Sequence, residues 1–143
     1  MYDNNRLLAK SLTYGGTLPL VFCIAARFVH VENIDITFIA QTYSTIIVAF
    51  LCGIHWATYL FFADKCPRNL LITSNIITLL AWSSLFATNQ PIATLLEVLC
   101  FLYLLTLDLK LRNAGLLPEW FYVLRRNATI IVILCLAILA GTS

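Results

Sequence analysis

The sequence predicts an all-α integral membrane protein: a bundle of five transmembrane helices with the N-terminus inside and the C-terminus outside. The composition, five apolar runs and the distribution of basic residues predict this fold class. Of the 143 residues, 61% are hydrophobic and only 11% are charged, whereas soluble domains carry roughly 25% charged residues. The length, with a mean hydropathy of +0.89, predicts one multi-pass membrane domain over residues 1–143.

Five apolar runs have about the length that a bilayer requires, since a hydrocarbon core about 30 Å thick needs roughly 20 helical residues. The predicted helices cover residues 11–29, 40–62, 69–87, 91–111 and 119–140. Backbone groups in lipid must pair within their own segment, which favours helices over isolated strands. The last run contains Arg125, so we expect it to start near Pro118 with Trp120 at the membrane interface. A re-entrant or interfacial segment is the alternative.

Basic residues are concentrated on one side of the predicted bundle. In short loops, Lys and Arg favour the cytoplasmic side of a membrane. Of the nine basic residues, all except Arg27 fall on one side when five spans are counted. This asymmetry predicts the stated orientation, in an inner membrane of the bacterial type.

Composition and spacing exclude several classes of site. A net charge of +2 without a basic stripe argues against a nucleic-acid partner. The five cysteines form no CxxC pair, so we expect neither a disulfide framework nor a metal centre. His30 and His55 differ in predicted depth by roughly 20 Å at about 1.5 Å per residue, which argues against a haem held between them. A single His55 could still bind a haem together with a partner subunit.

A polar layer is predicted inside the membrane, where ionisable side chains are costly and usually functional. His55 in the second helix and Asp108 in the fourth fall at nearly equal depth near the inner surface. Tyr14, Asn75 and Arg125 fall in or near the same layer. In one interpretation these side chains form hydrogen bonds that hold the helices together. In the other they form a pocket for a proton, a quinone-like headgroup or another ligand, with His55 titrating and Asp108 orienting it.

The fourth predicted helix has a face that we expect to point inward. Residues at steps of four, three and four share it: Glu97, Phe101, Leu104 and Asp108. Glu97 lies nearer the outer surface, where Arg27 is the basic residue expected to neutralise it. On the third predicted helix, Asn75 and Trp82 are seven residues apart and are also expected to face the interior.

Small residues predict close helix contacts in the first two helices. Gly15 and Gly16 in the first helix and Gly53 in the second would allow another helix to approach closely. Pro19 is expected to kink the first helix.

Several motifs together resemble one known family. They are Tyr14-Gly15-Gly16 with Pro19, Gly53-Ile54-His55-Trp56, Leu80-Ala81-Trp82, Asp108, and Ala114-Gly115-Leu116-Leu117-Pro118 followed by Trp120 and Arg125. The pattern resembles the domain of unknown function 3429, a family similar to mitochondrial transmembrane protein 69, over nearly the whole chain. Cys52 departs from it where a second glycine is expected, and Ala57 where a glycine is common. The resemblance marks six residues as defining the module and implies no reaction: His55, Trp56, Asp108, Pro118, Trp120 and Arg125.

We expect a non-catalytic accessory subunit or assembly factor that docks on a larger membrane complex, such as a respiratory enzyme. The chain offers no nucleotide loop and few intramembrane charges, and its expected partners are the lipid bilayer and other membrane subunits. The alternative is a carrier or membrane enzyme whose ligand, quinone or proton site is built on His55 and Asp108. A third interpretation is scaffolding through self-association. Enzymatic activity is the less favoured expectation, and the sequence specifies no cofactor and no catalytic residue.

Overall fold

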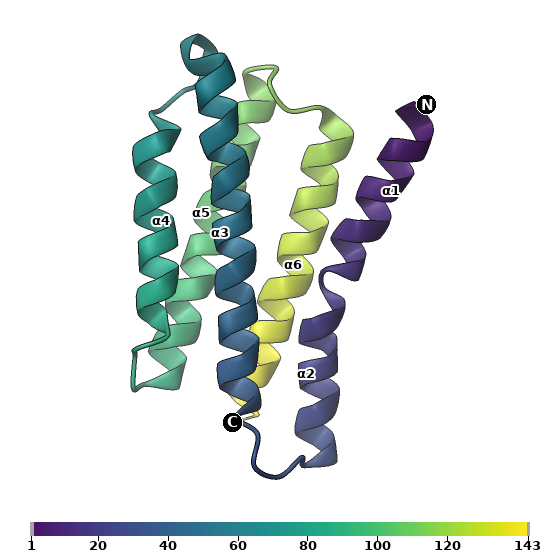
Figure 1. Cartoon of the computed structure of the whole chain (residues 1–143), viewed down its shortest axis with the longest axis vertical. Helices are drawn as coiled ribbons and strands as arrows, with labels where there is room; N and C mark the ends of the chain where they lie inside the picture. Colours follow the sequence, from purple (N-terminus) through teal and green to yellow (C-terminus); the bar gives the residue numbers. More distant parts are fainter. Residues whose placement is uncertain (1, 143) are drawn as a thin grey trace.

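The computed structural model describes residues 2–142, which form a helical bundle (Figure 1). The elements in chain order are α1 (Tyr2–Gly15), α2 (Leu18–Val29), α3 (Ile36–Phe62), the 3₁₀ helix η1 (Ala63–Lys65), α4 (Leu70–Ser84), α5 (Gln90–Asn113) and α6 (Glu119–Gly141). α3 packs against α4, α5 and α6, while α1 and α2 form a bent arm beside the bundle. The two ends of the chain lie at opposite ends of the bundle in Figure 1.

Four helical segments are long and apolar enough to cross a membrane. They are Asp3–Val29, Ile36–Lys65, Gln90–Asn113 and Glu119–Gly141. α4 is also apolar but has only 15 residues, a length of about 22 Å at about 1.5 Å per residue, against a hydrocarbon core of about 30 Å. The chain is therefore an all-α protein with helices suited to a membrane, and α4 is the predicted span that falls short.

The first predicted helix, 11–29, is two helices that begin earlier, at Tyr2, and break between Gly15 and Leu18. Pro19 lies in the first turn of α2, where it lacks an N–H and its ring excludes the carbonyl of the residue four positions earlier. The Thr17 hydroxyl donates to the Tyr14 carbonyl at the break. The expected kink is thus a full interruption of the helix.

Side-chain caps fix the start of three other helices. Asp35 accepts a hydrogen bond from the Phe38 N–H, so α3 starts four residues before the predicted Ala40. Asn69 and Asn89 cap α4 and α5 in the same way. α4 ends at Ser84 rather than at residue 87, because the next three N–H groups bond three residues back, as in a 3₁₀ turn. α5 and α6 lie within two residues of their predicted limits.

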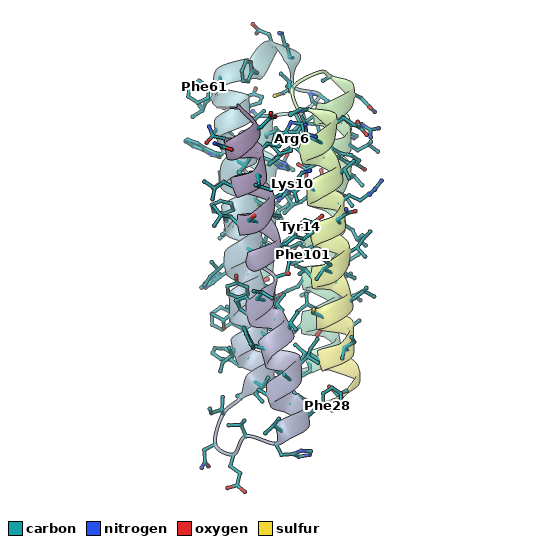
Figure 2. All side chains as sticks on the ribbon, turned by 90° about the vertical axis from the view of Figure 1, so that its right-hand side faces the viewer. Arg6, Lys10, Tyr14, Phe28, Phe61 and Phe101 are labelled. Carbon is teal, nitrogen blue, oxygen red and sulfur yellow. The ribbon has the colours of Figure 1, made fainter. Side chains whose placement is uncertain are left out.

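The outer surface of the bundle is largely apolar. Large side chains that are more than half exposed occur on every long helix, among them Phe22, Phe50, Phe61, Leu79 and Leu134. Figure 2 shows Phe61 near the same end of the bundle as Arg6 and Lys10, with Phe28 at the other end. An apolar surface of this extent suits contact with lipid rather than water.

Candidate functional site

Three ionisable side chains from three helices meet inside the bundle. His55 of α3 and Arg125 of α6 both contact Asp108 of α5, which lies between them. The His55 Nε2 lies 2.7 Å from one carboxylate oxygen of Asp108. The Arg125 Nε and Nη2 donate to the other oxygen at 3.1 and 2.8 Å. All three residues are at most 7% exposed, so the cluster is shielded from the surroundings of the bundle.

The hydrogen bonds indicate how charge is distributed in this triad of His55, Asp108 and Arg125. Asp108 as a carboxylate accepts from both partners, and its charge offsets that of Arg125. The His55 Nδ1 is buried and has no hydrogen-bond partner within residues 2–142. A neutral imidazole with its proton on Nε2 satisfies Asp108 and leaves only a lone pair at Nδ1, whereas an imidazolium would bury an unpaired N–H. The triad therefore sums to zero charge with a neutral ring.

A repeating pattern in the sequence places each triad member. Buried residues recur at steps of four, three, four and three on each helix: Gln41, Thr45, Val48, Cys52 and His55 on α3, Glu97, Phe101, Leu104, Asp108 and Leu111 on α5, and Arg125, Thr129, Val132, Leu136 and Leu139 on α6. This spacing keeps side chains on one face of a helix. The inward face predicted for the fourth helix is thus buried along its whole length.

Tyr14 and Asn75, the other residues predicted for the polar layer, do not contact the triad. Tyr14 is 39% exposed, and its hydroxyl accepts a hydrogen bond from Asn127. Asn75 is exposed and donates to the Leu71 carbonyl of its own helix. Trp82 is exposed as well, so the expectation that this face of the third helix points inward is wrong.

Small side chains explain which face of α4 packs inward. The buried residues after Leu70 are Ser74, Ile77, Ala81 and Ser84. Small residues let neighbouring helix backbones approach closely, and α4 packs against α3 and α5. The spacing of Ser74, Ala81 and Ser84 is the sequence signal that could have identified this face.

Glu97 forms a second buried polar cluster, between α3, α4 and α5. It is 0% exposed, and one carboxyl oxygen accepts hydrogen bonds from Thr45 at 2.8 Å and Ser84 at 2.9 Å. The predicted pairing of Glu97 with Arg27 is wrong, because Arg27 donates to the Thr37 hydroxyl and the Thr142 carbonyl. Hydroxyl groups on adjacent helices replace the expected cation.

The residues predicted as structural motifs have separate environments. A Cβ added at Gly53 would meet nothing within 4 Å, so the close helix approach expected there is not observed. Trp56 is 43% exposed on the outer surface. Pro118 occupies the N-cap position of α6, with no side-chain hydrogen bond to the helix. Trp120 lies in the first turn of α6, where the Arg6 guanidinium is 5.0 Å from its ring centre.

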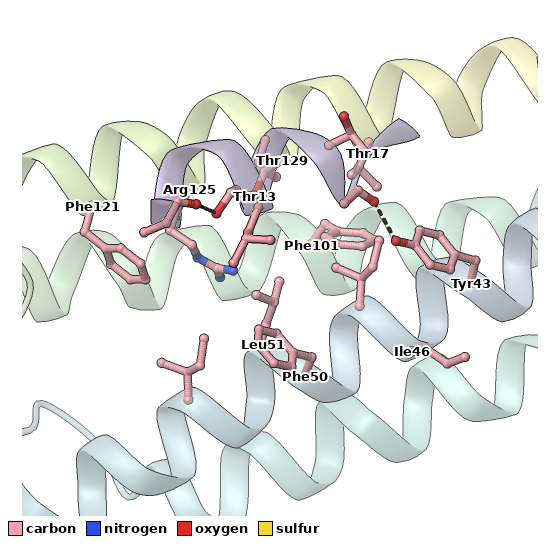
Figure 3. Close-up of a pocket in the computed structure, with 17 residues that line it drawn as sticks. Thr13, Thr17, Tyr43, Ile46, Phe50, Leu51, Phe101, Phe121, Arg125 and Thr129 are labelled. Carbon is pink, nitrogen blue, oxygen red and sulfur yellow. Dashed lines mark hydrogen bonds between the residues drawn. The ribbon is translucent and has the colours of Figure 1, made fainter. Parts of the chain in front are cut away.

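An apolar cavity lies beside the triad, between the α1–α2 arm, α3 and α6 (Figure 3). Its volume is about 470 Å³, within the range of roughly 300–1,000 Å³ that is typical of ligand sites. Arg125 is the triad member that lines it, and Thr129 lines it one helical turn further along α6. The Tyr43 hydroxyl closes one side by donating to the Gly16 carbonyl at 2.6 Å, at the break between α1 and α2.

The sequence did not predict this cavity: Arg125 was expected in the polar layer and Phe101 on an inward face, but no residue was expected to line a cavity with them. Four aromatic side chains line it: Tyr43, Phe50, Phe101 and Phe121. Arg125 and Thr129 are four residues apart, a spacing that brings two side chains together on a helix. That pair was the available signal, whereas the aromatic residues come from three helices whose relative rotation was unknown.

The comparisons with known proteins yield one family. The sequence profile described as "Protein of unknown function (DUF3429)" matches residues 6–141. Among curated proteins and among solved structures, none matches this chain. Because the matched region covers almost the entire sequence, including the triad and the cavity, the chain belongs to the DUF3429 family.

Proposed function

We propose that this protein binds a small hydrophobic ligand within the membrane, in the cavity beside the triad. The observation that supports the proposal is a largely apolar cavity of about 470 Å³ with one wall formed by Arg125, a side chain fixed by Asp108. Ligand sites in general combine an apolar lining with a few fixed polar groups. His55 and Asp108 have a positioning role in this proposal, since Asp108 holds Arg125, His55 contacts Asp108, and neither lines the cavity.

Entry from the bilayer is consistent with the exposure of the cavity lining. Leu12, Ile46 and Phe50 line the cavity and are each more than half exposed. These side chains lie on the α1 and α3 sides of the cavity, so an apolar molecule would reach it sideways from lipid. The break between α1 and α2 lies at this cavity, because Gly16 and Thr17 line it.

Mass spectrometry of the protein purified in mild detergent tests this proposal. Ala128 lines the cavity, so Ala128→Phe should fill it and remove a co-purifying hydrophobic molecule. Ala57→Phe is the matched control, because Ala57 is exposed on α3 and does not line the cavity. Equal occupancy in both variants, or no bound molecule in the unaltered protein, would contradict the proposal.

A second candidate function is an accessory subunit or assembly factor that docks on a larger membrane complex, such as a respiratory enzyme. Asn75 favours it, since this amide is exposed on α4 at a depth where polar groups usually find a partner in another helix. Its carbonyl oxygen accepts no hydrogen bond within the described residues, 2–142, and would be available to a partner subunit.

Quantitative affinity purification tests this second candidate. A partner recovered in stoichiometric amount with the unaltered chain should be lost at least tenfold with Asn75→Leu. Ile76→Leu is the control, since Ile76 is an exposed apolar neighbour on α4. Recovery of lipid and self-contacts alone would count against docking, as would equal recovery with both variants.

For the placement in the membrane, we infer five spans in an inner membrane of the bacterial type, with the N-terminus inside. Support comes from three segments that carry basic residues and lie at the same end of the bundle. They are the start of α1, the region of η1 and the α5–α6 connection (Figure 1). The basic residues of these segments are Arg6, Lys10, Lys65, Arg68, Lys110 and Arg112. Positive charge at one end favours the cytoplasmic side. In this proposal α4 also crosses, as the third of the five spans, with local thinning of the bilayer.

A further inference from the structure

We infer that the cavity selects a neutral, planar ring that carries a carbonyl oxygen, as in the benzoquinone class, attached to a hydrocarbon tail. This inference rests on the proposed ligand-binding function and adds the chemical class of the ligand. Four observations carry it: two unpaired donors, the neutrality of the triad, the aromatic lining and the apolar mouth. The inference concerns binding alone.

Two hydrogen-bond donors on α6 are available in the cavity. Arg125 uses Nε and Nη2 to hold Asp108, and within residues 2–142 its Nη1 makes no hydrogen bond. Likewise, the Thr129 hydroxyl has no hydrogen-bond partner among the described residues, although Thr129 is 5% exposed. Neither atom is among the fully buried unpartnered polar atoms of the described residues, so both are accessible from the cavity that these residues line. An acceptor oxygen on the ligand would satisfy both, since the two residues are one helical turn apart.

The other hydroxyls of the cavity are already occupied. Thr13 donates to the Ala9 carbonyl at 2.8 Å, Thr17 to the Tyr14 carbonyl at 2.7 Å, and Tyr43 to the Gly16 carbonyl at 2.6 Å. The dashed line in Figure 3 beside Tyr43 marks the last of these bonds. Acceptor recognition is therefore confined to Arg125 and Thr129.

Charge favours a neutral ligand. The Arg125 charge is offset by Asp108, and a neutral His55 ring leaves the triad without net charge. A carboxylate or phosphate group placed in the cavity would lack a counter-charge in a low-dielectric environment, which is expensive. A carbonyl oxygen accepts the same hydrogen bonds without this cost.

The lining favours a ring over a plain alkyl chain at the polar end. Figure 3 shows Phe101 and Phe121 near Arg125, with Phe50 and Tyr43 across the same space on α3. Aromatic side chains interact favourably with other rings in stacked or edge-to-face arrangements. A hydrocarbon tail would leave the cavity between Leu12, Ile46 and Phe50, toward lipid.

Binding of matched probes to the full chain in detergent tests the inference. Decylbenzoquinone should bind about tenfold more tightly than decylbenzene, because about 1.4 kcal/mol of hydrogen bonding corresponds to a factor of ten. Laurate offers an anionic headgroup, and dilaurin offers a neutral lipid ester with no ring. Both should bind more weakly than the quinone. Thr129→Val should reduce the preference for decylbenzoquinone over decylbenzene at least threefold.

Thr13→Val is the matched control, because Thr13 lines the same cavity and its hydroxyl is already bonded to Ala9. It should leave the preference unchanged. Equal binding of decylbenzoquinone and decylbenzene would overturn the inference and leave the ligand-binding function intact. If laurate bound most tightly, the inference that the cavity selects a neutral ligand would be wrong. If dilaurin bound most tightly, the ligand would be a lipid rather than a ring compound, which would also overturn the inference. Failure of all four probes, with no molecule bound in the purified protein, would overturn both proposals.

Discussion

At the scale of single residues, the two buried carboxylates are stabilised in different ways. Asp108 lies between a guanidinium and an imidazole, so its charge has a direct counterpart. Glu97 contacts two hydroxyls, and its second oxygen has no partner within residues 2–142. A polar group buried in a bilayer needs such contacts to offset desolvation. Each carboxylate joins α5 to two other helices, which fixes the position of α5 in the bundle.

Two ion pairs between α5 and α6 provide a comparison of buried and exposed charge. Asp108→Asn removes the counter-charge of Arg125 and should lower the free energy of unfolding by about 3 kcal/mol or more, as expected for breaking a buried pair. Glu119→Gln breaks the pair with Arg112, whose oxygen-to-nitrogen distance is 3.3 Å at an exposed site, and should cost about 0–1 kcal/mol. Reversible unfolding in mixed micelles measures both. Equal losses would show that the buried pair adds no more stability than the exposed one.

Part of the site follows from the sequence. Depth can be counted along a helix, because each residue rises about 1.5 Å, and this places His55 and Asp108 at one level. They are in contact in the structure. How each helix is rotated relative to its neighbours cannot be counted in the same way. For this reason Asn75 was wrongly expected in the polar layer, and Arg27 was wrongly expected to pair with Glu97. α4 carries apolar residues all round, so its hydrophobic pattern did not indicate which face packs inward.

At the scale of elements, the bent arm and α3 determine the cavity. The break after Gly15 leaves the Gly16 carbonyl without a helical partner, and the Tyr43 hydroxyl of α3 supplies one. The starts of α3, α4 and α5 follow from the capping residues Asp35, Asn69 and Asn89. Those caps are local signals readable in the sequence, whereas the end of α4 depends on a 3₁₀ turn with no distinctive residue.

Gly53 tests whether the glycine of the Gly-Ile-His-Trp motif is needed for packing in this chain. Since a Cβ there meets nothing within 4 Å, Gly53→Ala should stabilise α3 by roughly 1 kcal/mol through its higher helix propensity. Ala57→Gly, one turn further on the same exposed face, should destabilise α3 by a similar amount. Thermal unfolding in detergent measures both. A loss of stability with Gly53→Ala would mean that another chain packs against this position.

At the scale of the whole molecule, the antiparallel order of α3, α4, α5 and α6 bears on how the chain crosses the membrane. Composition and apolar run lengths suffice to predict an all-helical membrane protein, because the cost of exposed backbone in lipid leaves few alternatives. They do not fix the number of crossings, since α4 is shorter than a typical span. A helix of this length can still cross when the bilayer thins locally or flanking residues reach the interface.

Five and four crossings differ in the side of the membrane that the end of the chain reaches. With five crossings, Cys66 after η1 and Thr142 after α6 lie on opposite sides of the membrane. With four, α5 and α6 have the reverse direction, so Cys66 and Thr142 lie on the same side. In a chain whose other four cysteines are replaced by Ala, an impermeant maleimide added outside whole cells should therefore label Thr142→Cys and spare Cys66. Lysed cells are the control and should allow labelling at both positions. Burial raises the pKa of the Cys66 thiol, so less thiolate is present at a given pH and its labelling should quicken as the pH rises. Matching accessibility of the two positions in intact cells would mean that α4 does not cross.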